Sequence, residues 1–183
     1  LSYTYIDTGA MYRGVACAYM KGEDHRNLER FLKNLDLRFE FKGKTKVFLD
    51  GKDISEDIRD PKVSLLASDL SQNRLVREHL KQQQRALGRK GGVVVEGRDT
   101  GSVVFPYADI RFYLDAHPDE RAKRRCLELS SKGVSAPLTV VKEEMLRRDK
   151  ADSEREIAPL IVPEGAVRID TTDIDPKGVV RIL

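Results

Sequence analysis

The 183-residue sequence has no tryptophan, only two cysteines and no long hydrophobic run. Hydrophobic residues make up 40% of the chain, yet no uninterrupted apolar stretch approaches the roughly 20 residues that a membrane-spanning helix requires. These features exclude an integral membrane protein. The aliphatic content is nevertheless too high for a disordered chain, and the length suffices for one domain with a buried core and room for an insert.

The chain also has little net charge. Its 33 lysines and arginines nearly balance its 30 aspartates and glutamates, which leaves a net charge of +3 at pH 7. A nucleic-acid-binding domain usually concentrates basic residues in a stripe or patch, and this weak excess does not favour one. We therefore expect neither a nucleic acid nor a membrane as a partner.

The two cysteines, Cys17 and Cys126, lie in stretches with helical patterning. Neither belongs to a C-x-x-C pair or has a histidine at ligand spacing. This pattern favours ordinary thiols in a reducing cytoplasm over the alternatives, a disulfide or a metal site.

Apolar patterning along the chain predicts alternating strands and helices. Strands are expected at 2–6, 93–95, 110–114 and 167–169, and helices at 10–20, 28–35, 118–131 and 139–150. The stretch 61–89 is also expected to be helical, with Asn73 as the N-cap of a second helix within it, and Pro118 is expected to begin the helix at 118–131. Residues 37–55 alternate apolar and charged positions, with turns at Gly43-Lys44 and Asp50-Gly51, which predicts about three antiparallel strands. The short apolar runs 93–95 and 110–114 predict strands buried on both faces of a parallel sheet. The fold class is therefore α/β, a parallel sheet with an antiparallel insert.

Two D-T-G triplets, Asp7-Thr8-Gly9 and Asp99-Thr100-Gly101, share their letters with the loops that form the carboxylate dyad of aspartic proteases. Such proteases are almost entirely β, whereas Asp7 opens a predicted helix and the chain between the triplets is mostly helical. Both triplets follow predicted strands, where α/β sheets bind ligands. The two carboxylates are better explained as hydrogen-bond acceptors for a polar ligand.

Five longer stretches identify a family. They are Tyr5-Ile6-Asp7-Thr8-Gly9-Ala10-Met11-Tyr12-Arg13, the run from Gly97 to Pro106, Leu114-Asp115-Ala116 with the charged segment to Arg125, the run from Arg148 to Leu160, and Asp170-Thr171-Thr172. In this order they resemble bacterial cytidylate (CMP) kinases, which are nucleoside monophosphate kinases, over essentially the whole chain. Each motif alone is too short to identify a family, but five in sequence are specific.

The resemblance implies a P-loop kinase-type parallel sheet with helices on both faces and a helical lid. It places the core at 1–21, 93–129 and 157–183, the insert that binds the nucleoside monophosphate at 22–92, and a mobile lid at 130–156. The implied activity is phosphoryl transfer from ATP, with Mg²⁺, to CMP and dCMP, giving CDP and dCDP. We expect a cytoplasmic monomer. The alternatives are a UMP/CMP-type kinase and a non-catalytic nucleotide-binding module.

The sequence departs from the family pattern at its phosphate-binding loop. The family carries G-x-x-x-x-G-K-[ST] ahead of its D-T-G stretch, and the 183 residues contain no such motif. Gly43-Lys44-Thr45 lacks the first glycine. Since the chain begins at Leu1, we expect that a preceding segment is absent and that these residues alone have no kinase activity. Smaller departures are Tyr107, where an acidic residue is usual, and Ala151, where a lid arginine is common.

The resemblance assigns arginines to the phosphates, which suits the bidentate and permanently charged guanidinium group. Arg13 and Arg98 are expected at the acceptor phosphate, and Arg155 is expected to reach the phosphates when the lid closes. Arg125 is expected at the ATP phosphates. The alternatives are exposed helix charges for Arg13 and Arg125, and an ion pair with Asp99 for Arg98.

The remaining site residues are assigned to the nucleoside. Ser68, Arg77 and Asp99 are expected to contact cytosine, and Arg148 and Asp152 the ribose. Three further residues are expected to border the acceptor site: Asp7, Thr8 and Tyr12. Of these, Thr8 is expected to offer a hydroxyl. The alternatives are a helix serine without a role at position 68 and a solvated salt-bridge ladder on one helix face formed by Arg148, Asp152 and Arg155. We assign no metal ligand, give no chemistry to His25, His79 or His117, and expect Arg121 and Arg124 to be solvated.

Overall fold

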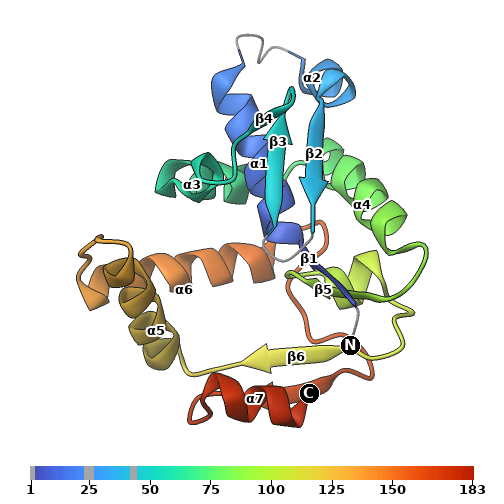
Figure 1. The fold of residues 1–183 in the computed structure, drawn as a ribbon. Helices are drawn as coiled ribbons and strands as arrows, with labels where there is room; N and C mark the ends of the chain where they lie inside the picture. The colour runs from blue at the N-terminus through green and yellow to red at the C-terminus, as the bar shows by residue number, and fades with distance from the viewer. Residues whose placement is uncertain (1–2, 23–26, 42–44) are drawn as a thin grey trace. The chain divides into compact units, whose positions relative to one another are not determined.

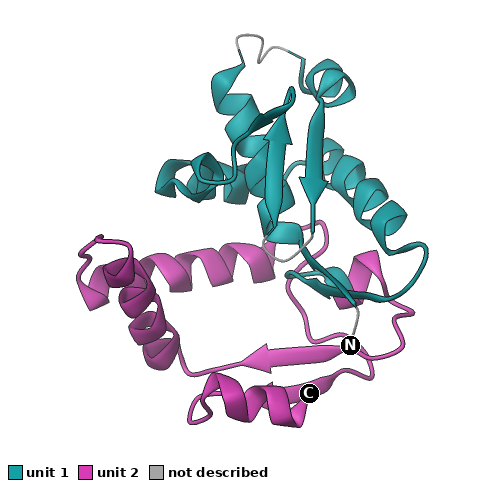
Figure 2. Cartoon of the chain, in the orientation of Figure 1, with its two compact units in different colours: residues 1–100 teal, residues 101–183 magenta. Residues whose placement is uncertain are grey.

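The computed structural model describes residues 3–22, 27–41 and 45–183. The chain forms two compact units, residues 1–100 and 101–183 (Figure 2). No helix among the described residues combines the length and the apolar character needed to cross a membrane.

The first unit contains a parallel strand pair and a small antiparallel sheet (Figure 1). Strand β1 (Thr4–Asp7) pairs with β5 (Val93–Glu96) so that Asp7 lies opposite Glu96. The antiparallel sheet has the order β2 (Leu37–Glu40), β3 (Lys46–Leu49), β4 (Lys52–Asp53). The helices are α1 (Thr8–Lys21), α2 (Leu28–Asn34), the short η1 (Asp57–Arg59), α3 (Pro61–Leu70) and α4 (Arg74–Gly88).

The hairpin and helix-cap signals in this unit are confirmed. Asp50 and Gly51 both have positive φ, 49° and 77°, as a two-residue turn between β3 and β4 requires. The side chain of Asn73 accepts a hydrogen bond from the backbone of Leu75 and begins α4. The predicted turn at Gly43-Lys44 lies outside the described residues.

Helix α1 is the centre of the hydrophobic core of the first unit. Met11 and Val15 are fully buried and pack with Val47 of β3 and Leu80 of α4. Cys17 also faces this core, where burial raises the pKa of its thiol. Cys17 and Cys126 are both free thiols in this structure.

The second unit has its own parallel strand pair and a helical hairpin. Strand β6 (Phe112–Asp115) pairs with β7 (Val167–Asp170), with Asp115 opposite Asp170. Helices α5 (Pro118–Ser131) and α6 (Leu138–Glu154) pack against each other, and α7 (Pro176–Ile182) follows β7. The short π-helical turn η2 (Thr100–Val104) begins at the end of the first unit. The predicted α/β class, with parallel strands and a small antiparallel sheet, is confirmed.

The prediction that the apolar strands are buried on both faces is wrong for the chain as described. Val94 is 51% exposed, as is its cross-strand neighbour Tyr5 at 41%, whereas Ile6 is 1% exposed. Successive side chains of a strand point to opposite faces, and in this two-strand pair one face is covered by the core while the other is open. In the second unit Leu114 is similarly 52% exposed.

Candidate functional site

Asp7 connects the end of β1 to the start of α1. Its carboxylate accepts a hydrogen bond from the backbone N–H of Ala10, at 2.8 Å, and so caps the helix. Its other oxygen, Oδ2, pairs with Nη2 of Arg13 at 3.0 Å. The side chain of Arg13 remains 28% exposed. Arg13 is thus a guanidinium held by a neighbouring carboxylate on one side and open to solvent on the other, and not an unattached helix charge.

Thr8 is buried, with 4% exposure, and its hydroxyl donates to the backbone oxygen of Glu96 at 2.7 Å. This bond joins the carboxyl ends of β1 and β5. The sequence predicted that the hydroxyl borders the acceptor site; the structure gives it a backbone partner between the two strand ends.

Arg77 and Asp99 form a buried ion pair, with side chains only 5% and 11% exposed. Nη1 of Arg77 also donates to the backbone oxygen of Ser71 at 2.9 Å, and the guanidinium carbon lies 5.7 Å from the centre of the Tyr12 ring. The backbone oxygen of Ser68 accepts from the Ser71 hydroxyl at 2.7 Å. The structure therefore joins four of the predicted site residues into one cluster. It adds Ser71, whose backbone contribution leaves no mark on the sequence.

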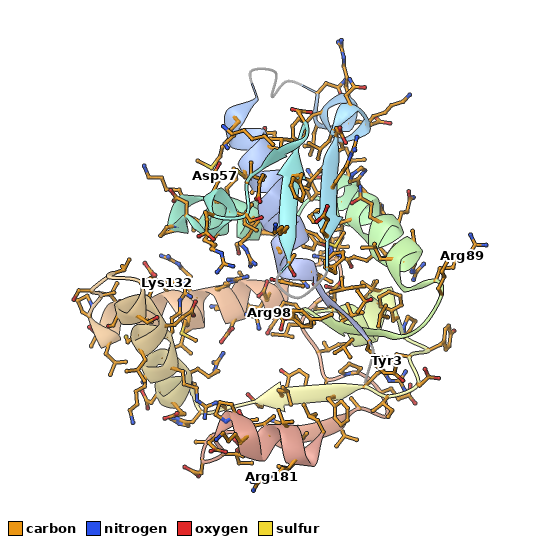
Figure 3. All side chains as sticks on the ribbon, viewed as in Figure 1. Tyr3, Asp57, Arg89, Arg98, Lys132 and Arg181 are labelled. Atoms are coloured by element: carbon orange, nitrogen blue, oxygen red, sulfur yellow. The ribbon has the colours of Figure 1, made fainter. Side chains whose placement is uncertain are left out.

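Arg98 and Asp99 are neighbours with opposite environments. Arg98, labelled in Figure 3, is the second residue after the end of β5. It is exposed, whereas Asp99 is 8% exposed. The loop thus presents a cation to solvent and turns a carboxylate inward to Arg77. This alternation places an exposed cation and a buried carboxylate on consecutive residues, the two that the sequence predicts at the phosphate and at the base.

In the second unit, Asp152 lies between two arginines at the end of α6. It is 3.9 Å from Nε of Arg148 and 3.3 Å from Nη1 of Arg155. The salt-bridge-ladder alternative placed Arg148 and Arg155 on one helix face. They do not share one, because α6 ends at Glu154 and Arg155 has an extended backbone. Nε of Arg155 donates to the backbone oxygen of Ala158 at 2.5 Å, and both Asp152 and Arg155 are buried. The alternative of a solvated ladder is therefore wrong.

The prediction that both Arg121 and Arg124 are solvated is wrong for Arg121, whereas the side chain of Arg124 is 42% exposed, as expected, although it has partners. Arg121 of α5 pairs with Asp149 of α6 at 2.6 Å, and both side chains are mostly buried. Arg124 pairs with Glu120 at 2.9 Å and donates to the backbone oxygen of Thr171 at 2.7 Å. Backbone carbonyl oxygens in the segment after β7 accept hydrogen bonds from this guanidinium, and such oxygens leave no signature in the sequence.

Arg125, the candidate for the ATP phosphates, pairs with Glu128 at 2.6 Å within α5. Both side chains are nearly half exposed. Glu128 also pairs with Lys132, and the hydrogen bonds from Lys132 and Arg125 lower the pKa of its carboxyl. The alternative of an exposed helix charge therefore matches the observed environment of Arg125, while its role toward ATP stays a prediction.

The described residues contain no group of three or more histidines, cysteines, aspartates or glutamates arranged to hold a metal ion. Proteins that use Mg²⁺ in phosphoryl transfer bind it through one or two carboxylates together with substrate phosphates, so such a group is not required. The arrangement can bind a polar anion in the first unit, where Arg13 is partly exposed, Arg98 is exposed, and Arg77 and Asp99 are buried as a pair.

Comparison with known proteins gives one consistent result. The model of the family described as "Cytidylate kinase" matches residues 1–183. Proteins named cytidylate kinase from Bacillus thuringiensis (strain Al Hakam), Bacillus cereus (strain AH187) and Bacillus anthracis (strain CDC 684 / NRRL 3495) are each 43% identical over 186 residues. Each match covers 99% of this chain and 83% of the relative. The chain therefore belongs to the cytidylate kinase family.

Proposed function

We propose that this protein transfers the γ-phosphoryl group of ATP to CMP and dCMP, giving CDP and dCDP. The family relationship and the names of the relatives support a nucleoside monophosphate kinase for cytosine nucleotides. The observation that carries the proposal is the buried Arg77–Asp99 pair beside Tyr12.

The chemistry of this pair suits cytosine. Cytosine has an amino donor at C4 and an acceptor at N3, and uracil has the opposite pattern at both positions. A carboxylate such as Asp99 accepts from the amino group, and a guanidinium such as Arg77 donates to N3. Because the two side chains already orient each other, little reorganisation is needed when the base binds. We propose Ser68, Arg77 and Asp99 as the base-binding residues.

The phosphate-binding residues are proposed on the same basis. The attacking phosphate of CMP is already an anion, so the site needs positioning and charge neutralisation more than a general base. Arg13 and Arg98 hold the acceptor phosphate, bordered by Asp7, Thr8 and Tyr12. Arg148 and Asp152 hold the ribose, Arg155 reaches the phosphates, and Arg125 contacts ATP. Mg²⁺ bound to the ATP phosphates supplies further positive charge.

The same proposal extends to organisation. Residues 22–92 bind the monophosphate, residues 130–156 form the lid, and residues 1–21, 93–129 and 157–183 form the core. We propose that the protein is a cytoplasmic monomer. Sedimentation velocity at micromolar concentration tests the oligomeric state, and a dimer peak would contradict it.

The first experiment measures nucleotide binding by calorimetry with CMP, dCMP, UMP and AMP. We expect CMP and dCMP to bind more tightly than UMP by about 1–3 kcal/mol for each discriminating contact. Asp99→Asn should weaken CMP far more than UMP. Asp57→Asn is a matched control, because Asp57 is also ion-paired, with Lys21, but is exposed and lies outside the proposed site. Equal losses for CMP and UMP would mean that Asp99 only positions the nucleotide.

The second experiment measures CDP formation from CMP, ATP and Mg²⁺. We expect no transfer by the 183 residues, which lack the G-x-x-x-x-G-K-[ST] motif, and transfer when the family's phosphate-binding segment is fused ahead of Leu1. A fusion that binds CMP but never forms CDP would favour the alternative of a non-catalytic nucleotide-binding module. A fusion that phosphorylates UMP as fast as CMP would favour the UMP/CMP-type kinase.

A further inference from the structure

The carboxyl ends of β1 and β5 approach each other unusually closely. Asp7 and Glu96 are opposite in the register, and the next residues along the two chains are Thr8 and Gly97. A Cβ atom placed on Gly97 would collide with Oγ1 of Thr8 and would lie 2.7 Å from Cγ2 of Thr100. Both separations are below 3.0 Å, which real Cβ atoms essentially never show. Only glycine therefore fits position 97 in this arrangement.

The threonine cannot easily move away from such a contact. Its χ1 angle is stiff because the side chain is β-branched, and its surroundings bury it to 4% exposure. Its hydroxyl donates to the backbone oxygen of Glu96 at 2.7 Å. The side chain of Glu96 is itself hydrogen-bonded to Tyr5 of β1. The two strand ends are thus fastened by a bond from Thr8 and by close packing on Gly97.

We propose that Thr8 and Gly97 form a positioning clasp that sets the separation of the two arginines at the acceptor phosphate. Thr8 begins α1, which carries Arg13, and Gly97 immediately precedes Arg98. Thr8 borders the acceptor site, but its hydroxyl donates to the backbone oxygen of Glu96, and its part in the clasp is to hold the strand ends together. The inference deepens the proposed function and rests on it, because the roles of Arg13 and Arg98 come from there.

The clasp has a specific consequence for ligand recognition. Asp99 has its own anchor in α4, the buried guanidinium of Arg77. Arg98 is exposed and has no comparable burial. Loosening the clasp should therefore disturb phosphate binding more than base binding, and CMP should lose affinity while cytidine, which has no phosphate, should not.

The test compares dissociation constants for CMP, by calorimetry, and for cytidine, by NMR titration at millimolar concentration. Thr8→Val removes the hydroxyl but keeps the shape, and we expect CMP to bind about 5- to 10-fold more weakly with cytidine changed less than about 2-fold. Thr8→Ser keeps the hydroxyl and should restore CMP binding. Thr4→Val, at an exposed threonine of β1 four residues before Thr8, is the matched control and should bind CMP as the unaltered chain does.

A second set of variants tests the close packing. Gly97→Ala should weaken CMP by at least about 10-fold, because the new Cβ must displace Thr8 or Thr100. Thr8→Ala combined with Gly97→Ala removes the nearer clash and should recover part of the loss. Gly22→Ala is the control, since a Cβ there meets nothing closer than 3.4 Å. If Gly97→Ala does not fold, as shown by circular dichroism, the comparison of Thr8→Val with Thr8→Ser still decides.

The outcomes separate the clasp from the proposed function. An unaltered chain that binds CMP no better than cytidine would overturn the phosphate-binding roles of Arg13 and Arg98, and the clasp with them. A chain that prefers CMP, together with a Thr8→Val variant that binds CMP equally well, would overturn the clasp alone. Equal losses for CMP and cytidine in Thr8→Val would also overturn it, because they would indicate general loosening of the fold.

Discussion

Arg77 in the first unit and Arg125 in the second show two ways of holding a guanidinium that is expected to meet a nucleotide. Arg77 is 5% exposed and is held by Asp99, by the backbone of Ser71 and by the ring of Tyr12. Arg125 is 44% exposed and pairs with Glu128, three residues away on the same helix. The first group is fixed by partners from several elements, and the second by one neighbour.

The difference matters because a guanidinium can be either preorganised or able to reorient, but not both. A buried pair is costly to break, since the remaining charge is left without a partner in a low-dielectric environment. An exposed pair contributes little and exchanges readily with solvent. A group that distinguishes cytosine from uracil benefits from the first arrangement, and a group that meets ATP phosphates as a lid closes benefits from the second.

The largest effect is expected from breaking the buried pair. Asp99→Asn removes the negative charge and leaves Arg77 buried, so the free energy of unfolding should fall by about 3–5 kcal/mol. Urea denaturation measures it. Replacing both residues, with Arg77→Met and Asp99→Leu, should recover much of the loss, because apolar groups of similar size need no partner. A loss below about 1 kcal/mol in Asp99→Asn would show that Arg77 is as well solvated as Arg125.

Much of the fold could be predicted because its signals are local. The Asp50-Gly51 turn, the Asn73 cap and the proline that begins α5 each lie within a few residues of the structure that they specify. Burial was harder. Val94 looks like a core residue in the sequence, yet its exposure depends on which elements cover that face, and strand composition does not encode the number of neighbours.

The candidate site, like the fold, has features that the sequence predicts and features that it does not. The arginines and aspartates could be named from the resemblance, but their partners could not. Arg77 meets Asp99 across 22 positions and Thr8 meets Glu96 across 88, and no spacing rule reaches so far. Arg124 is exposed as expected, but its backbone-oxygen partners could not be foreseen, because every residue carries such an oxygen. The sequence therefore indicates which residue types form the site, but not which distant groups hold each of them in place.

A smaller effect is expected where two helices of the second unit are joined. Arg121 of α5 and Asp149 of α6 pair at 2.6 Å and are 28% and 22% exposed, between the two extremes. A double-mutant cycle with Arg121→Met and Asp149→Asn should give a coupling energy of about 1 kcal/mol. Amide exchange in α5 and α6 should also quicken in each variant. Additive effects, as expected for Arg125 and Glu128, would show that the pair is effectively a surface contact.

The comparison between buried and exposed groups also applies to the pH dependence of stability, through His79. Burial lowers the pKa of His79 in α4 below its usual value near 6.5. The folded state therefore disfavours the protonated ring, the unfolded state binds more protons, and stability is present above about pH 6.5 and lost as the pH falls toward the lowered pKa. His79→Gln should make the decline in unfolding free energy between pH 7 and 5 shallower. Gln82→Ala, at an exposed position without a titratable group in the same helix, should leave the slope unchanged. Identical slopes for both variants would contradict the role of burial.

The smallest effect is expected at Arg125. Glu128→Gln removes its ion-pair partner while keeping the side-chain length, and because both groups are nearly half exposed the stability should change by less than about 0.5 kcal/mol. The variant instead tests whether the pair competes with ATP. If Arg125 must leave Glu128 to reach the phosphates, the substitution should strengthen ATP binding slightly, and the gain should shrink at high salt as screening weakens the pair in the unaltered chain.

Lys132 shares the same carboxylate, so Lys132→Met is the matched control, since it removes a partner of Glu128 while leaving the glutamate to Arg125. Weaker ATP binding in Glu128→Gln would mean that the glutamate orients Arg125 for the nucleotide, and the contrast with the preorganised Arg77 would then disappear.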